Sequence, residues 1–360
     1  RVGNARDVAV PVFGKRDSRT LPSLCRRGPR NSNRVHGAKH LSTRRAMPRD
    51  AKPVRHRVRL FPVILSRFQP HLRFSMWESE KSESGLRTIV DEFDTDRYGL
   101  QRLHAKLGNT DGLFVDIGAN IGFFTVIVGL LFPRATVISF EPQPSTFANL
   151  IRNVRHHNLT SRVTPRNYGL GFEDYKAKAA YSDLNSGGSS TYSLSGWGGK
   201  PDGEDVKDLK THVDVALRDP VRKLDEMIAA RGDIEYLKLD CEGCEYEVFA
   251  SLPWHRILHF GFEQHGFEHV LDGAKRLSDN AVARYNASVE AIDALIKDPR
   301  GALRAQYVGG DQNGFYRVTR EAVDLVDATR RKYGLPSLAD SYIRAGGDIL
   351  FAAILRPLVS

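Results

Sequence analysis

Long hydrophobic runs are missing from this sequence of 360 residues. No apolar stretch reaches the roughly 18 residues that a transmembrane helix needs, and the apolar residues 121–132 are too few. Cysteine is also scarce, because Cys25, Cys241 and Cys244 are the only three. They cannot form a disulfide framework, which favours a reducing, intracellular compartment. The sequence therefore predicts a globular protein without a membrane span.

Acidic residues are almost absent from the first 60 positions, which carry 17 Lys or Arg and 3 Asp or Glu. The remaining residues carry 36 basic and 40 acidic side chains, so the net charge of +10 comes from this end of the chain. Residues 1–58 show no sustained apolar period and are predicted to be a disordered basic tail or an organellar targeting segment. A nucleic-acid-binding arm is the alternative. It is disfavoured because aromatic residues do not interleave with the basic ones.

The most regular pattern, residues 113–141, reads as strand, glycine turn, helix and strand. Its first apolar run is long enough for a buried parallel strand. The middle is apolar almost all round, as a helix packed on a sheet would be, and Asn120 is a good N-cap for it. The last part, residues 136–140, is β-branched and aromatic. This stretch is therefore predicted to be a βαβ unit.

Polar residues at the ends of these strands suit a nucleoside. A glycine turn lets the backbone approach a ligand closely, and an acid that ends the neighbouring strand can accept hydrogen bonds from both ribose hydroxyls. The cofactor-binding candidates in the unit are Asp116, Gly118, Asn120, Gly122 and Glu141. Asn167 and Tyr168 follow the next predicted strand and are assigned to the adenine by position alone. We expect an adenosine-containing ligand at the strand ends.

Predicted strands and helices alternate along the rest of the chain. Further strands are expected at residues 162–167, 234–240, 257–263 and 348–355. Helices are expected at residues 82–107, 144–154, 221–230, 246–249 and 278–297. This alternation predicts an α/β fold with a doubly wound, mainly parallel sheet and helices on both faces, in a domain over residues 82–360. The Gly/Ser-rich residues 182–203 are interpreted as a surface loop or a mobile lid over the pocket.

Four segments resemble the FkbM family of S-adenosylmethionine (SAM)-dependent methyltransferases. They are VDIGANIGFFT, SFEPQPSTFANLIRNVRHHNL, YLKLDCEGCEYEVF and FGFEQH, and they lie within residues 110–265. The glycine segment alone is typical of class I methyltransferases, and its combination with the third segment is more specific. The resemblance implies a Rossmann-like methyltransferase sheet, SAM as cofactor, and O-methylation of a hydroxyl on a sugar, polyketide or similar small molecule. Cys241 and Cys244 depart from the family pattern, in which small apolar residues are usual.

The resemblance also suggests roles for the candidate residues. Asp116 and the turn from Gly118 to Gly122 would hold the methionine end of SAM, and Glu141 would bind the ribose. The catalytic candidates at the ends of the fourth and fifth strands are Lys238, Asp240, Glu242, Glu263 and His265. Asp240 is the best candidate for a general base or an acceptor-orienting group. A structural acid paired with Lys238, which lies on the same strand face, is the alternative.

No metal is expected. Cys241 and Cys244, like His265 and His269, have the internal spacing of zinc ligands. Both pairs, however, coincide with a methyltransferase motif that needs no metal. A redox role for the two cysteines is disfavoured because acidic residues lie within the motif.

Three other functions remain open. An NAD-dependent Rossmann oxidoreductase would share the βαβ unit but should show G-x-G-x-x-G, which this turn lacks. A nucleobase-amine methyltransferase usually carries a D/N-P-P-aromatic segment where this chain has Asp240 to Gly243. The intact Asp116, Glu141 and Asp240 argue against a non-catalytic adenosine-binding module with a basic arm. The expected partner is therefore a small-molecule hydroxyl acceptor and not a nucleic acid.

Overall fold

The computed structural model describes residues 57–68, 70–181, 211–265, 278–296, 303–308 and 314–338. These residues belong to one unit of the chain, Arg55–Ser360. Residues 1–56 of the predicted tail, the predicted lid at 182–203, His269 and the predicted strand at 348–355 lie outside the described residues.

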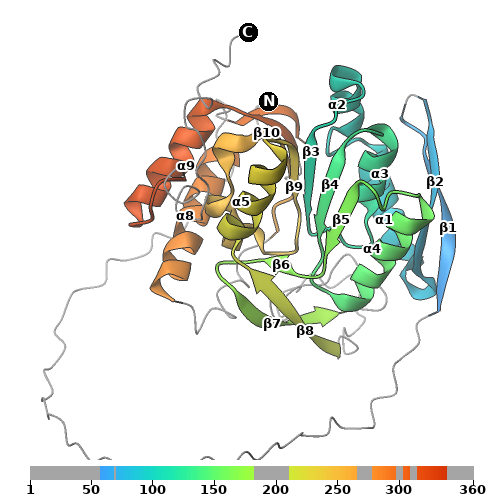
Figure 1. The fold of residues 1–360 in the computed structure, drawn as a ribbon, viewed down its shortest axis with the longest axis horizontal. Helices are drawn as coiled ribbons and strands as arrows, with labels where there is room; N and C mark the ends of the chain where they lie inside the picture. Colours follow the sequence, from blue (N-terminus) through green and yellow to red (C-terminus); the bar gives the residue numbers. More distant parts are fainter. Residues whose placement is uncertain are drawn as a thin grey trace, which may run out of the picture. The chain divides into compact units, whose positions relative to one another are not determined.

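A seven-stranded sheet forms the centre of this unit (Figure 1). Its five parallel strands are, in spatial order, β10 (Ile257–Phe262), β9 (Ile234–Leu239), β3 (Leu113–Ile117), β4 (Thr136–Phe140) and β5 (Val163–Arg166). β12 (Gly314–Val318) pairs antiparallel with β10, and β11 (Leu303–Val308) pairs antiparallel with β12. The chain runs outward from β3 to β5 and returns to β9, so the strand order reverses between β3 and β9. The predicted doubly wound, mainly parallel sheet is confirmed.

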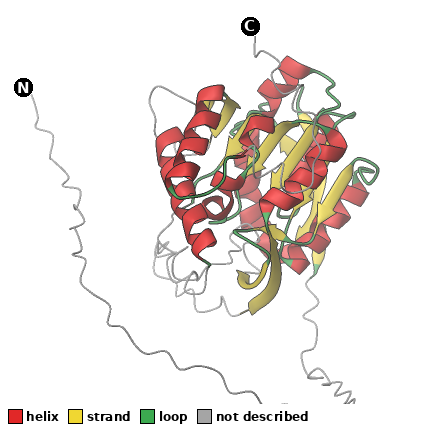
Figure 2. Cartoon of the chain, turned by 60° about the vertical axis from the view of Figure 1, so that its left-hand side comes forward, coloured by secondary structure: helices red, strands yellow, loops and turns green. Residues whose placement is uncertain are grey.

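Helices cover both faces of the sheet (Figure 2). On one face lie α1 (Glu83–Asp94), α2 (Leu100–Leu107), α3 (Phe123–Leu131) and α4 (Pro144–His156). On the other lie α5 (Pro220–Arg231), α6 (Glu245–Val248), α8 (Asp279–Ile296) and α9 (Arg320–Lys332). Successive strand residues point to opposite faces, so Phe114 belongs to one hydrophobic cluster and Val115 to the other. Both strand faces are thus buried, which explains why β3 reads as a continuous apolar run.

An antiparallel hairpin precedes the predicted domain. Its strands are β1 (Val58–Leu65) and β2 (Leu72–Ser79), and β1 carries Pro62 opposite Ser75. Phe61 and Met76 are buried in the same cluster as α3 and α4. Asn153 of α4 accepts a hydrogen bond from the Trp77 amide at 2.6 Å. The hairpin therefore packs on the domain, although the sequence analysis left residues 59–81 unassigned.

The predicted helix at 82–107 is two helices, and this part of the prediction was wrong. α1 ends at Asp94 and α2 begins at Leu100, and between them Asp96 and Gly99 adopt positive φ angles of 53° and 64°. The Asp96 carboxylate accepts the Gln101 amide at 2.9 Å, which caps the start of α2. The break lets Tyr98 point toward the strand ends instead of continuing a helical face.

A small three-stranded sheet lies beside the strand ends. It consists of β6 (Gly169–Leu170), β7 (Tyr175–Tyr181) and β8 (Thr211–Arg218), in the order β6-β8-β7. Gly169 and Leu170 of this sheet line the cavity described below.

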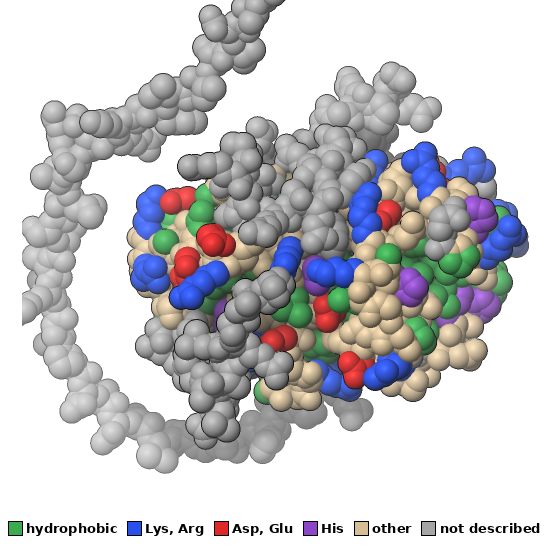
Figure 3. Space-filling model, turned by 90° about the horizontal axis from the view of Figure 1, so that it is seen from above, with side chains coloured by type: hydrophobic (Ala, Val, Ile, Leu, Met, Phe, Trp, Pro, Cys, Tyr) green, Lys and Arg blue, Asp and Glu red, His purple; other side chains and the backbone are tan. Residues whose placement is uncertain are grey.

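Acidic and basic side chains are interspersed on the face drawn in Figure 3. This mixture fits the near balance of charge after residue 60. Of the helices that the structure describes, none combines the length and hydrophobicity needed to span a bilayer.

Candidate functional site

A cavity of about 320 Å³ opens at the carboxyl ends of the central parallel strands. It lies where the strand order reverses between β3 and β9, the place at which open α/β sheets bind ligands. Most of the predicted site residues line it. They are Gly118, Asn120, Glu141, Lys238, Asp240, Glu242, Glu263 and His265.

The Glu141 carboxylate is fixed in the wall of this cavity. Only 7% of Glu141 is exposed. Its Oε2 accepts the Asn120 amide at 2.9 Å and its Oε1 accepts the Gln143 amide at 2.8 Å. Burial raises the pKa of Glu141 to about 7, and the two amides oppose that shift. The carboxylate is therefore oriented by backbone groups before any ligand arrives.

Gly118 and Gly122, the two glycines of the turn, allow close contacts with different parts of the chain. Gly118 has a φ of 80°, and a Cβ there would lie 1.8 Å from the Asp240 carbonyl oxygen. Only glycine lets the loops after β3 and β9 approach this closely. Gly122 has a φ of 91° and packs against Leu150 of α4, outside the cavity lining. It also occupies the N-cap of α3, the position that the sequence analysis gave to Asn120.

Three further cofactor candidates lie outside the cavity lining. Asp116 is fully buried, and its Oδ2 accepts the Thr125 hydroxyl at 2.7 Å. The side-chain amide of Asn167 donates to the Glu141 carbonyl at 3.0 Å and so braces that segment. The Tyr168 ring packs against Phe140. The structure thus gives these residues contacts within the protein, and their contact with a cofactor stays a prediction.

Lys238 links the two acids predicted at the ends of β3 and β9. Its Nζ lies 2.9 Å from Asp240 Oδ2 and 3.5 Å from Asp116 Oδ1, and it donates to the Gly118 carbonyl at 3.1 Å. Burial would lower the pKa of Lys238, but Asp240 and Asp116 together raise it. Burial likewise would raise the pKa of Asp240, but Lys238 holds it below its usual value. Both groups of this pair are therefore charged at neutral pH.

A tyrosine that the sequence analysis missed joins the two strand-end acids. The Tyr98 hydroxyl is 2.9 Å from Asp240 Oδ2 and 3.0 Å from Glu263 Oε2, within donating distance of both. Tyr98 is 1% exposed. No local motif marks it, because the contact spans 142 residues of sequence and depends on the break between α1 and α2.

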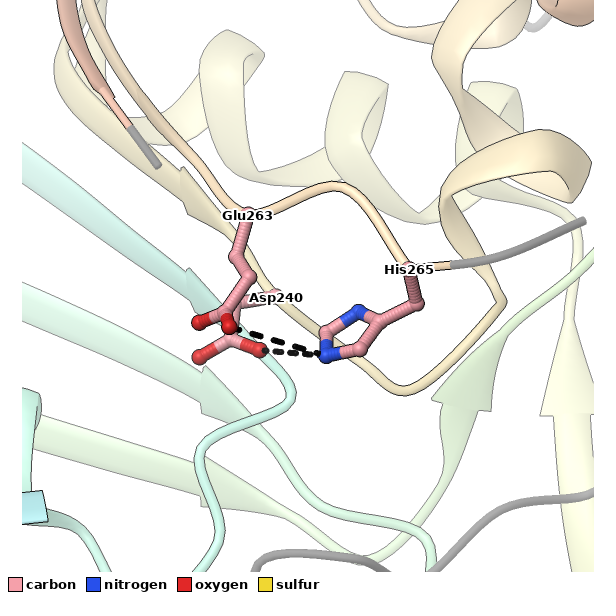
Figure 4. A group of neighbouring side chains, drawn as sticks. All are labelled: Asp240, Glu263 and His265. Carbon is pink, nitrogen blue, oxygen red and sulfur yellow. Dashed lines mark ion pairs between the residues drawn. The ribbon is translucent and has the colours of Figure 1, made fainter. Parts of the chain in front are cut away.

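Asp240, Glu263 and His265 converge inside the cavity (Figure 4). His265 Nε2 lies 4.0 Å from Asp240 Oδ1 and 3.9 Å from Glu263 Oε1. The other ring nitrogen, Nδ1, lies 3.2 Å from Oε1 of Glu245, which is fully buried. Burial would lower the pKa of His265, but Glu245 and other carboxylates raise it to about 11.

Two more carboxylates share this end of the cavity. Glu242 Oε2 lies 3.5 Å from His265 Nε2, and burial raises the pKa of Glu242 to about 8. Glu92 of α1, which the sequence analysis missed, also lines the cavity. Burial, with Glu263 and Asp240, raises the pKa of Glu92 to about 7. Acidic groups therefore dominate the cavity at the ends of β9 and β10.

The sequence of this chain matches the model of a known protein family. The family model of the methyltransferase FkbM domain matches residues 116–301, just over half of the chain. The chain belongs to the FkbM methyltransferase family. The resemblance seen in the sequence is therefore confirmed, and the cavity lies within a methyltransferase domain.

Two curated relatives are similar to this chain over part of their length. Methyltransferase 1 of Beauveria bassiana is 28% identical over 153 residues, which cover 39% of this chain and 59% of that protein. The 31-O-demethyl-FK506 methyltransferase FkbM of Streptomyces tacrolimicus is 30% identical over 199 residues, 51% of this chain and 76% of that protein. The chain thus spans about three fifths of the first relative's length and about three quarters of the second's.

A solved FkbM methyltransferase from Methylobacillus flagellatus KT is also similar. It is 18% identical, with a TM-score of 0.30, and the match covers 58% of this chain and 48% of that one.

Tyr98 and Glu92 precede the matched family region, which begins at Asp116. These two cavity contacts therefore come from the part of the chain that lies ahead of the matched family domain.

The two cysteines beside the cavity form a disulfide. Cys241 and Cys244 are bonded to each other, and both line the cavity. Paired in this way, they offer no thiolate to a zinc ion. The absence of zinc itself stays a prediction.

Proposed function

We propose that this chain is a SAM-dependent O-methyltransferase that acts on a hydroxyl of a sugar, polyketide or similar small molecule. The observation that carries the proposal is the Glu141 carboxylate, fixed by two backbone amides in the cavity wall at the end of β4. A carboxylate at this position of a Rossmann-like sheet can accept hydrogen bonds from both ribose hydroxyls. The name of the Streptomyces relative also indicates O-methylation by that protein.

The residues around Glu141 fit the adenosine end of SAM. Each Glu141 oxygen accepts one amide hydrogen and keeps a second lone pair for a ribose hydroxyl. Gly118 and Asn120 line the same wall as Glu141. These three residues would hold the adenosine and methionine parts of the cofactor.

When bound, SAM supplies a methyl group already activated on sulfur. The chain must then orient the acceptor hydroxyl and accept one proton. Asp240 stays ionised beside Lys238 and would orient the hydroxyl rather than take its proton. Glu242 and Glu263 line the same end of the cavity and could accept that proton.

Replacing Glu141 with alanine should weaken SAM binding by about 10- to 100-fold. Hydrogen bonds to a charged acceptor contribute about 1.5–3 kcal/mol each, and one such bond is taken as the net loss after partial compensation by water. Calorimetric titration of both proteins with SAM and with NAD measures the effect.

The matched control for Glu141→Ala is Glu226→Ala on the exposed side of α5. It should leave SAM affinity unchanged. Equal SAM affinity in wild type and Glu141→Ala would remove Glu141 from the site. Tighter binding of NAD than of SAM by the wild type would sink the methyltransferase proposal.

Ligand affinity should also depend on pH through Glu141. Its pKa is raised to about 7, with Asp116 and Lys238 as the more distant charges acting on it. Ribose hydroxyls favour the ionised carboxylate, so binding is favoured above the pKa and weakened as pH falls through it. Affinity for 5′-methylthioadenosine, which lacks the amino acid part of SAM, should fall about tenfold from pH 8 to pH 6.

The test is calorimetry at both pH values with wild type and Glu141→Gln. The amide does not titrate, so the variant should bind weakly with a flat pH profile. A flat profile for the wild type would show that ionisation of Glu141 is not coupled to ligand binding.

A further inference from the structure

Three donor atoms on two neighbouring strand ends point at one position in the cavity. Asp240 Oδ1, Glu263 Oε1 and His265 Nε2 all lie within 4.8 Å of one another, and Figure 4 shows the two carboxylates facing the imidazole. Each of the three side chains is about one fifth exposed, so the position is partly shielded but open to the cavity. A donor set of this kind is one that metal ions use.

The other carboxylate oxygens are already engaged. Tyr98 lies within hydrogen-bonding distance of Asp240 Oδ2 and Glu263 Oε2, and Lys238 pairs with Asp240 Oδ2. These contacts turn Oδ1 and Oε1 toward His265. The two carboxylates are therefore held in place by groups outside the three donor atoms.

The imidazole is oriented by a separate buried acid. Glu245 is fully buried, and its Oε1 faces His265 Nδ1 at 3.2 Å. The amides of Cys241 and Gly243 donate to the two Glu245 oxygens at 2.8 and 2.9 Å. A histidine that binds a metal through one nitrogen usually donates its other N–H to such a carboxylate. This arrangement leaves Nε2 aimed into the cavity, where a bound metal ion would displace its proton.

The cavity lining also holds more carboxyl groups, the ligands that hard cations prefer, than basic groups. Among the described lining residues, the acids are Glu92, Glu141, Asp240, Glu242 and Glu263, and the bases are Lys238 and His265. Lys238 also forms an ion pair with Asp116, which is buried beneath the cavity. The lining therefore carries more acidic than basic groups at the place where the three donors meet.

We propose that Asp240, Glu263 and His265 bind a divalent cation of the Mg²⁺ and Mn²⁺ class. Carboxylate-rich sites suit these hard cations, and three protein ligands leave about three octahedral positions for other oxygen atoms. Metal–ligand bonds of about 2.0–2.2 Å require the three donors to close in by about 1 Å.

This inference rests on the proposed function and narrows its substrate class. The ion would hold an acceptor with two adjacent oxygen atoms, such as vicinal hydroxyls or a hydroxyl beside a carbonyl. The bound hydroxyl would give its proton to a carboxylate or to water. Its oxygen would form the new bond to the methyl carbon as the carbon–sulfur bond breaks, with S-adenosylhomocysteine as the leaving group.

The deciding experiment is calorimetric titration of Mn²⁺ alone into the full chain after EDTA treatment, without SAM or acceptor. Wild type should bind one Mn²⁺ per chain, and His265→Ala should bind at least about 100-fold more weakly. Glu245→Gln keeps all three donors but loosens the imidazole, so it should weaken binding about 10- to 100-fold. His71→Ala, an exposed histidine in the loop between β1 and β2, is the control and should bind as wild type does.

No binding at millimolar Mn²⁺, or equal affinity in His265→Ala and wild type, would overturn the site. A thermal melt of each variant shows whether a loss of binding follows from unfolding. Full methyl transfer in EDTA would overturn the role of the ion in the reaction. Mn²⁺ binding by a protein that does not bind SAM would support the metal site while removing the proposed function.

Discussion

Replacing Lys238 with methionine should lower the free energy of unfolding by about 3–5 kcal/mol. Lys238 is 3% exposed, and its ammonium group lies between the carboxylates of Asp116 and Asp240. Methionine keeps most of the packing volume and removes only the charge and the hydrogen-bond donors. The expected loss is large because burial already raises the pKa of the fully buried Asp116, and without Lys238 this carboxyl must carry an uncompensated charge or take up a proton.

Chemical denaturation at pH 7.5 measures this loss. The matched control is Lys223→Met on α5, where the lysine pairs with the exposed Glu226 and should contribute only about 0.5 kcal/mol. The double variant Lys238→Met/Asp116→Asn removes the stranded charge and should recover part of the stability. If Lys238→Met costs no more than Lys223→Met, the buried charge pair does not stabilise this fold.

The βαβ unit was predictable because its residues carry local signals. The β-branched strand at 136–140 matches β4, and Pro144 does occupy the first turn of α4. Parallel strands place their carboxyl ends at one edge. For that reason, motif residues far apart in sequence, from Gly118 to His265, could be expected in one cavity, and most of them line it.

Elements at the edges of the fold were not predictable in the same way. β1 contains Pro62 and follows a basic stretch, so its alternation does not read as a strand. Edge strands tolerate proline because they need fewer backbone donors. β12 and β11 lack a motif, and their pairing with β10 depends on tertiary contacts. The break before α2 depends on Asp96 in a left-handed conformation, which helical periodicity alone does not reveal.

Most of the predicted site residues line the cavity, but the sequence did not show which residues lie behind them. Asp116 reads as a ligand-facing acid, because it ends β3 beside the glycine turn. The structure instead buries it below the cavity, where its Oδ2 accepts the Thr125 hydroxyl and its Oδ1 lies 3.5 Å from Lys238 Nζ. Glu245 contacts His265, and Tyr98 contacts Asp240 and Glu263. Only the folded chain shows these contacts.

Asp240→Asn should reduce methyl transfer by about 10²–10⁴-fold while leaving the cofactor end of the cavity intact. Asparagine has nearly the same shape, so an oxygen can still accept from Tyr98 or Lys238. The negative charge that would orient the acceptor is lost, and Lys238 is left paired with Asp116 alone. Because Glu141 is held by backbone amides at the other end of the site, the cofactor should still bind.

Two quantities are measured for each variant, the turnover number and the affinity for the cofactor product. Transfer of labelled methyl to an acceptor found by screening hydroxylated compounds gives kcat, and calorimetry with S-adenosylhomocysteine, which carries no charge on sulfur, gives the cofactor affinity. That affinity should stay within about threefold of wild type. Asp111→Asn, at an exposed aspartate paired with Arg134, is the control and should retain full turnover. If Asp240→Asn turns over as fast as this control, Asp240 is a structural partner of Lys238, and the acceptor must be oriented by Glu263 and His265.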